Sequence, residues 1–97
     1  MKNQLKKHER KTPAILTLFE KSEIIGARAV DLQKPPHARA FPIQLTMEEV
    51  NALASKGPRE IAECEFNKGK LPMQIRRVHA DGSFELWDLS ELRFVKT

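Results

Sequence analysis

Apolar residues recur with a helical period after Thr17, and a start signal precedes them. Thr17 and Glu20 have the spacing of a capping box, in which each side chain accepts a hydrogen bond from the other residue's backbone amide. The apolar positions that follow at helical spacing are Leu18, Ile25, Ala29 and Leu32. The pattern predicts a helix that begins after Thr17 and ends before Pro35.

Gly26 lies inside this predicted helix. A glycine there costs about 1 kcal/mol relative to alanine. Two explanations stay open from the sequence. Either another backbone approaches Gly26 closely, or the glycine is a tolerated defect.

Two shorter helices are predicted in the middle of the chain. Prolines make the segment after the first helix irregular, at Pro35, Pro36 and Pro42. Thr46 and Glu49 form a second capping box and predict a short helix that ends near Ser55. Pro58 suits the first position of a third helix, and Gly69 is its natural end. One face of that helix carries Ile61, Ala62, Glu65 and Phe66.

The pattern becomes strand-like over residues 73–79 and 84–89. The dipeptide Asp81-Gly82 between them predicts a β-hairpin with a two-residue turn, in which both turn residues need positive φ. Such a turn fixes the register of the strands. The expected pairs are His79 with Phe84, Arg77 with Leu86, and Arg76 with Trp87.

The expected fold class is α+β, with two to three helices packed with the C-terminal hairpin. A further short strand is expected over residues 93–95, and Arg76 is expected to make a cation–π contact with Trp87. A chain of 97 residues is at most one domain. We expect that domain over residues 14–97, with an inserted connector at about residues 34–57, and a flexible basic tail over residues 1–13.

The charge is concentrated at the N-terminus. Residues 1–11 hold five basic side chains and one acidic one, whereas the other 86 residues hold 12 of each. The net charge of +4 therefore belongs to the tail. A basic arm of this kind can bind phosphate, so a small nucleic-acid-binding module is the alternative function. The rest of the chain has no basic excess that would mark a nucleic-acid-binding face.

The sequence indicates a protein without catalytic chemistry of its own. The three histidines and the single cysteine, Cys64, do not have the spacing of metal ligands. The four glycines do not form a phosphate-binding loop. We therefore expect no cofactor and no metal, and the absence of a long apolar run predicts no membrane span.

Two charged blocks resemble the motifs of a known family. The first block contains Thr17, Phe19, Glu20, Ile25, Gly26, Arg28 and Ala29. The second contains Leu71, Pro72, Ile75, Arg76, Arg77, Asp81, Gly82 and Trp87. Their order and content resemble the omega-like family of RNA polymerase subunits, which includes bacterial omega, archaeal subunit K and the sixth subunit shared by the eukaryotic nuclear polymerases.

The resemblance implies a non-catalytic subunit of a multisubunit DNA-directed RNA polymerase. Such subunits clasp the largest subunit and promote assembly and stability of the complex, so DNA is a partner only indirectly. By motif match, the residues expected to bind the partner are Thr17, Phe19, Glu20, Gly26, Arg28, Ala29, Pro72, Arg76, Arg77, Asp81 and Trp87. The expected location is intracellular, at the site of transcription: the nucleus, the archaeal cytoplasm, or a viral transcription site.

Three features depart from the family pattern. The N-terminal tail is short and basic, whereas the nuclear subunits carry a long acidic tail. The connector over residues 34–56 is longer than usual, and Glu23 stands where the family usually has a basic residue. These departures suggest a divergent lineage, such as a large DNA virus or an unusual microbe.

Overall fold

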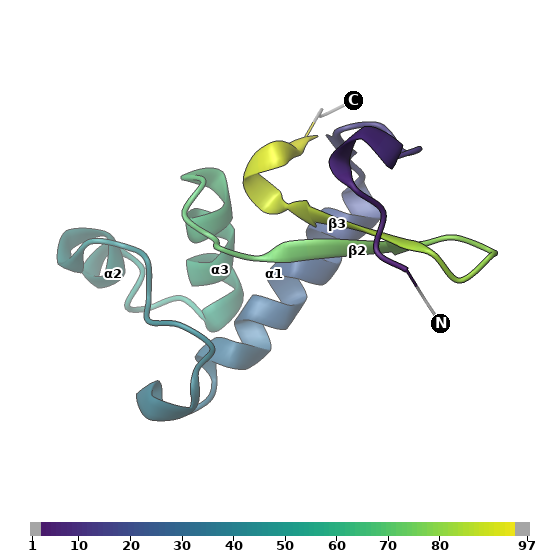
Figure 1. Ribbon diagram of the computed structural model, residues 1–97. Coiled ribbons are helices and arrows are strands. Elements are labelled where there is room, and N and C mark those ends of the chain that lie inside the picture. Colours follow the sequence, from purple (N-terminus) through teal and green to yellow (C-terminus); the bar gives the residue numbers. More distant parts are fainter. Residues whose placement is uncertain (1–2, 95–97) are drawn as a thin grey trace. The chain divides into compact units, whose positions relative to one another are not determined.

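A computed structural model describes residues 3–94 and divides the chain into two compact units (Figure 1). The first unit consists of Met1–Glu20 together with Pro72–Thr97, and the second of Lys21–Leu71. Over the described residues, three α-helices, a C-terminal hairpin and a pair of short strands confirm the α+β class.

Helix α1 (Leu18–Leu32) confirms the first capping box. The Thr17 amide donates to Glu20 Oε1 at 3.0 Å, and the Glu20 amide donates to Thr17 Oγ1 at 3.1 Å. These two bonds satisfy backbone donors that the first helical turn leaves without a partner. The helix ends at Leu32, before Pro35 as predicted.

The other two helices also begin where the sequence predicts. Helix α2 (Met47–Ala52) has its capping box at Thr46 and Glu49, and it ends before Ser55 because Leu53 leaves helical backbone geometry. Helix α3 (Pro58–Asn67) has proline in its first turn. After α3, Gly69 adopts φ 66°, the left-handed conformation that terminates many helices.

The core of the second unit is small. Ile25 and Leu32 of α1 pack with Ala62 of α3, and three half-buried side chains cover them: Ile43, Ile61 and Phe66. Leu18, the first position of the predicted apolar stripe, is exposed instead. The buried stripe of α1 therefore starts at Ile24 and Ile25.

The hairpin consists of β2 (Gln74–Val78) and β3 (Phe84–Asp88), and its predicted register is wrong by one residue. The observed pairs are Gln74 with Asp88, Ile75 with Trp87, Arg76 with Leu86, Arg77 with Glu85, and Val78 with Phe84. A shift of one residue changes which side chains share a face, because side chains alternate along a strand.

The turn explains the shift. The His79 amide donates to the Ser83 carbonyl at 2.8 Å, so the loop between this bonded pair has three residues rather than two. Within that loop only Gly82 has positive φ, at 90°. Asp81 instead accepts hydrogen bonds from the amide and the hydroxyl of Ser83. This is the three-residue hairpin loop that ends in a left-handed glycine.

The corrected register gives the hairpin one buried face. Ile75, Glu85 and Trp87 are buried on it, and Arg77 lies among them. The expected cation–π pair of Arg76 with Trp87 is therefore wrong. Arg76 lies over the Phe84 ring at 4.2 Å, whereas Arg77 lies 5.5 Å from the centre of the Trp87 ring.

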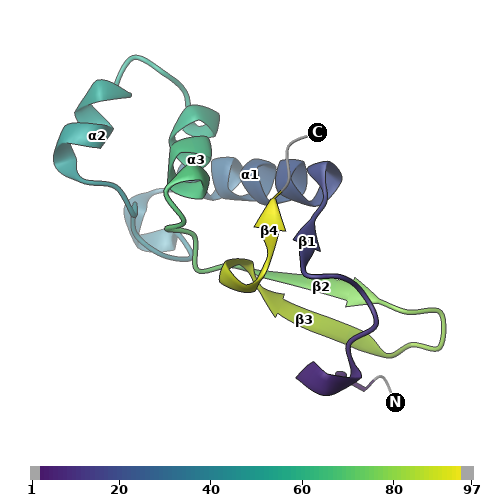
Figure 2. The same cartoon turned by 90° about the horizontal axis from the view of Figure 1, so that it is seen from above.

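Two short strands complete the first unit. Strand β1 (Ile15–Leu16) pairs in parallel with β4 (Arg93–Phe94), and the two lie side by side in Figure 2. The end of the expected strand at Val95 lies outside the described residues. No helix among residues 3–94 is long and apolar enough to cross a bilayer.

Two glycine substitutions should have opposite effects on stability. In the described part of the chain, no atom lies within 4 Å of a β-carbon placed on Gly26, so the chain itself supplies no close backbone approach there. Gly26→Ala should raise the free energy of unfolding by about 0.5–1 kcal/mol. Gly69→Ala should lower it by about 1 kcal/mol, because an alanine is strained at that φ. Urea unfolding of both variants checks this, and a destabilising Gly26→Ala would contradict it.

Candidate interaction site

Arg77 on β2 joins three segments of the first unit. Its guanidinium makes a two-bond pair with Glu20, in which Nε and Nη2 each donate at 2.9 Å. The same group donates to Thr12 Oγ1 at 2.9 Å and to the carbonyls of Pro13 and Ile15 at 2.8 and 2.7 Å. Arginine suits this role because its fixed fork can satisfy several acceptors at once.

The pairing with Arg77 lowers the pKa of Glu20. The hydrogen bond from Arg77 is the main reason that the pKa of Glu20 is lowered to about 2, and the Thr17 amide contributes to the same direction. Glu20 therefore has two functions: it caps α1 and it neutralises Arg77. This explains why the Thr17 and Glu20 motif and the Arg77 motif, distant in sequence, lie together.

Glu85 on β3 is the second acidic centre of the first unit, and its side chain is 0% exposed. It accepts hydrogen bonds from the Lys11 amide at 2.9 Å, Thr12 Oγ1 at 2.5 Å and Trp87 Nε1 at 2.8 Å, and His79 Nε2 lies 2.7 Å away. Burial raises the pKa of Glu85, but these bonds outweigh burial and lower the pKa to about 2.

Arg10 covers Trp87 from the N-terminal segment. Its guanidinium lies 3.9 Å from the centre of the Trp87 ring, donates to Glu91 at 3.1 Å and also contacts the Leu86 carbonyl. A cation over an indole face is attracted by the ring quadrupole. One basic residue of the N-terminal segment is therefore used within the chain.

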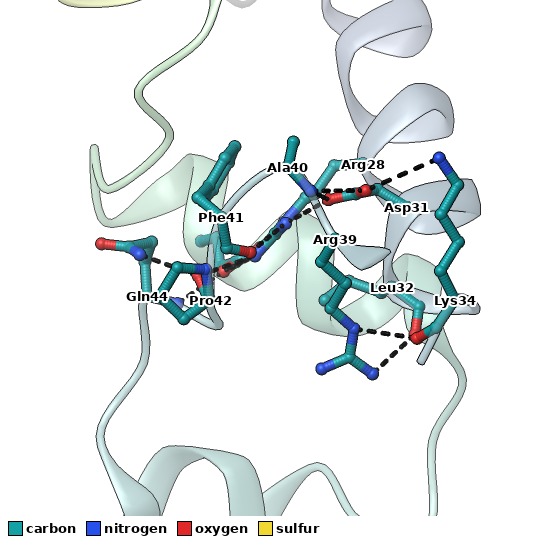
Figure 3. Close-up of polar contacts among 10 residues, drawn as sticks. Arg28, Asp31, Leu32, Lys34, Arg39, Ala40, Phe41, Pro42 and Gln44 are labelled. Atoms are coloured by element: carbon teal, nitrogen blue, oxygen red, sulfur yellow. Dashed lines mark hydrogen bonds and ion pairs between the residues drawn. The ribbon is translucent and has the colours of Figure 1, made fainter. Parts of the chain in front are cut away.

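A second buried arginine organises the second unit. Arg28 on α1 is 1% exposed, and its guanidinium donates to Glu65 of α3 at 2.8 and 3.0 Å and to Asp31 at 2.6 Å. It also donates to the carbonyls of Phe41 and Pro42 at 3.1 Å (Figure 3). Burial lowers the pKa of Arg28, but the bonds to Glu65 and Asp31 outweigh it and raise the pKa.

The two carboxylates extend this cluster to the connector. Asp31 accepts from the Ala40 amide at 3.0 Å (Figure 3). Glu65 accepts from the Gln44 amide at 2.7 Å. The Phe41 ring lies 3.9 Å from the Arg28 guanidinium. The irregular segment after α1 is thus held by one ion cluster, which supplies the hydrogen bonds that a helix or sheet would otherwise provide.

The motif residues fall into buried and exposed groups. Four are buried or largely buried, namely Arg28, Ala29, Arg77 and Trp87, and the side chains of Arg28, Arg77 and Trp87 have hydrogen-bond partners within the chain. Five are exposed: Thr17, Phe19, Pro72, Arg76 and Asp81. Among the described residues of the first unit, Phe19 is the most exposed large apolar side chain, at 71%. Thr17 and Glu20 form the cap, and Gly26 is half-buried.

Sequence reasoning missed most of the partners of the two arginines. Thr12, which accepts from Arg77, and Asp31, which accepts from Arg28, had no motif that marked them. Glu65 did have a signal, since it falls on the apolar face of α3 beside Ala62. An acidic residue at such a position is buried only when it has a partner.

The described residues contain no group of three or more His, Cys, Asp or Glu side chains that could hold a metal ion. The two clusters are ion pairs and hydrogen bonds between protein groups, and each acidic residue in them is matched by an arginine or by backbone donors. These contacts hold segments of the chain together.

Comparison with known proteins links the chain to transcription. The chain matches no protein-family model. It is 36% identical over 86 residues to the RPABC2 subunit of DNA-directed RNA polymerases I, II and III of Saccharomyces cerevisiae, covering 89% of this chain and 49% of that protein. The Schizosaccharomyces pombe RPABC2 subunit is 30% identical over 86 residues, covering 89% and 54%.

A plant relative gives the same result. Subunit 6B of DNA-directed RNA polymerases II and V of Arabidopsis thaliana is 32% identical over 83 residues, covering 86% of this chain and 51% of that protein. The chain is thus similar to the omega-like family of RNA polymerase subunits, as its two sequence motifs predict. It spans about half the length of the curated relatives it matches.

Removal of Arg28 should destabilise the second unit strongly. Arg28→Ala leaves the buried Glu65 without its cation and takes the closer of two cations from Asp31, and loss of one partner of a buried pair costs about 3–5 kcal/mol. Arg59→Ala, at an exposed position of α3, is the matched control. Urea unfolding should separate the two variants, and an equal small effect of both would show that the cluster contributes nothing to stability.

Acid should weaken the first unit of the chain through Glu85. The pKa of Glu85 is lowered from 4.5 to about 2, so its stabilising effect is complete above about pH 4.5 and is lost as the pH falls towards 2. Glu85→Gln should therefore be less stable than the wild type at pH 7, and the difference should shrink below pH 4.5.

The single tryptophan reports on this unit directly, because Trp87 Nε1 donates to Glu85. Urea unfolding followed by Trp87 fluorescence at pH 7, 4 and 3 measures the difference. Glu63→Gln, at an exposed position of α3, is the control. A difference between wild type and Glu85→Gln that stays constant across these pH values would contradict the assignment.

Proposed function

We propose that this chain is a non-catalytic subunit of a multisubunit DNA-directed RNA polymerase, and that it clasps the largest subunit. The observation that carries the proposal is the similarity of 86–89% of the chain to three subunits that are named for these polymerases. The family motifs Thr17–Ala29 and Leu71–Trp87 both lie within the described residues.

The physical role follows from linkage. A chain that binds only the assembled state of a complex stabilises that state. The chain would act at the site of transcription and would meet DNA only through the complex. It would add no residue to the centre that transfers nucleotides.

The division into buried and exposed motif residues supports two kinds of contribution. Phe19, Pro72, Arg76 and Asp81 are exposed and would contact the partner. Arg28 and Trp87 are buried and would hold each unit in shape. An exposed aromatic residue is a common anchor of interfaces, because burying it removes a large apolar area from water.

The N-terminal contacts bear on the alternative, a nucleic-acid-binding arm. Arg10 is engaged with Trp87 and Glu91, and Lys7 lies 3.5 Å from Glu91. Fewer positive charges of the arm are thus left to neutralise phosphates. A nucleic-acid-binding module would show binding that falls steeply with salt and that is lost when residues 1–11 are deleted.

Co-purification at low salt tests the proposal. The tagged wild-type protein should bring down the large polymerase subunits of its source. Phe19→Ser should reduce recovery by about tenfold, because an interface anchor is worth more than 1 kcal/mol, and should leave the melting temperature unchanged.

Met47→Ser is the matched control, since Met47 is also an apolar residue on a helix and is 75% exposed. Recovery of no polymerase subunit by the wild-type protein would refute the proposal. Equal losses for Phe19→Ser and Met47→Ser would remove Phe19 from the interface. Salt-sensitive binding to nucleic acid without polymerase would favour the alternative.

A further inference from the structure

The backbone of the hairpin has two outer edges. In an antiparallel pair, residues alternate between those whose amide and carbonyl face the partner strand and those whose groups face outward. The Leu89 amide donates to the Met73 carbonyl, and the His79 amide to the Ser83 carbonyl. The outward-facing residues of β2 are therefore Gln74, Arg76 and Val78.

The outer edge of β3 is already occupied by the chain itself. The Phe84 amide donates to the Asn3 carbonyl at 2.9 Å, and the Leu5 amide donates to the Phe84 carbonyl at 2.7 Å. Further along, the Leu86 carbonyl accepts from Arg10, and the Asp88 amide donates to Glu91 at 2.9 Å. The N-terminal segment thus covers this edge at Phe84, through one isolated parallel bridge between Gln4 and Phe84.

The outer edge of β2 has no such cover. Among residues 3–94, no hydrogen bond reaches the outward amides or carbonyls of Gln74, Arg76 and Val78. Val78 is 57% exposed, and Arg76 and Gln74 are exposed as well. An exposed strand edge with unpaired backbone groups is a template for another strand.

Arg76 gives this edge a chemical preference. Within the part of the chain that the structure describes, no carboxylate pairs with Arg76, whereas the neighbouring Arg77 is neutralised by Glu20. The Phe84 ring, 4.2 Å from the Arg76 guanidinium, positions this charge. The edge therefore presents three unpaired backbone positions, one free positive charge and one exposed valine.

We propose that the outer edge of β2 receives an extended segment of the polymerase subunit that this chain binds, with a carboxylate of that segment paired to Arg76. The added strand would make main-chain hydrogen bonds with Gln74, Arg76 and Val78, which is the mode of recognition by strand addition. This inference rests on the proposed function and names the chemistry of its partner.

Charge complementarity distinguishes this occupant from a second copy of the chain. Two β2 edges paired antiparallel about Arg76 would place two Arg76 side chains opposite each other, and like charges in that position are destabilising. An acidic strand instead gains an arginine–carboxylate pair. The remaining explanation is that Arg76 only prevents aggregation through this edge, and that explanation predicts no bound strand.

Amide hydrogen exchange of the free chain and of the complex tests the proposal. In the free protein, the amides of Gln74, Arg76 and Val78 should exchange fast, while those of Ile75 and Arg77 in the same strand should exchange slowly. In the polymerase complex, the three outward amides should slow by about tenfold or more. The inward amides of β2 serve as the internal control, because they are bonded in both states.

A charge reversal adds a second readout. Arg76→Glu should weaken recovery of the polymerase by about tenfold or more, because the charge pair becomes a repulsion. Arg93→Glu, at an exposed position of β4, is the matched control with the same change in net charge. Both variants are checked for an unchanged melting temperature.

The outcomes separate this inference from the proposed function. If the complex forms but Gln74, Arg76 and Val78 still exchange fast, the strand addition is wrong and the function stands. Equal losses for Arg76→Glu and Arg93→Glu would likewise overturn the acidic partner. If the wild-type chain recovers no polymerase subunit, both proposals fail. Concentration-dependent protection of the same amides in the isolated chain would assign the edge to a second copy instead.

Discussion

The two-bond pair between Arg77 and Glu20 is the interaction on which the first unit depends. That unit has few buried apolar side chains, and its segments come from both ends of the chain. Arg77 gathers them by donating to Glu20, to Thr12 and to two carbonyls of residues 13–15. A buried charge is tolerated only when its donors are satisfied, so the guanidinium constrains every segment it touches. The hydrogen bonds of Arg77 thus fix the arrangement of these segments, which the few buried apolar side chains alone would not specify.

The second unit uses the same solution with different residues. Arg28 holds two carboxylates and two connector carbonyls, and its carboxylates in turn accept connector amides. The connector has little regular secondary structure between residues 33 and 46, so its backbone groups need partners from elsewhere. An arginine in each family motif therefore has an internal partner in the free chain. These two arginines, Arg28 and Arg77, would therefore affect recognition indirectly, by stabilising the unit in which each lies, and not by contacting the partner.

Local signals were readable from the sequence, and long-range partners were not. Thr17 with Glu20, Thr46 with Glu49, and Pro58 marked helix starts because caps act over three or four residues. The hairpin was found, but its register was missed because Asp81-Gly82 suits both two-residue and three-residue loops. The Arg28–Glu65 pair joins residues 37 positions apart, beyond any local pattern. Of the candidate site, the sequence could indicate Arg76 and Arg77 but could not tell which of them was already paired.

The different environments of these two adjacent arginines follow from the period of two in a strand. Arg77 points to the face of Trp87 and Glu85, where Glu20 and Thr12 complete its bonds. Arg76 points to the opposite face, and its backbone groups lie on the open edge of β2. The charge of Arg77 is neutralised by Glu20 within the unit. The charge of Arg76 has no carboxylate partner among the described residues, and it lies beside the unpaired backbone groups of β2. In the proposed function the two arginines have different roles, because their side chains lie on different faces of one strand. Arg77 would stabilise the first unit, and Arg76 would bind the partner.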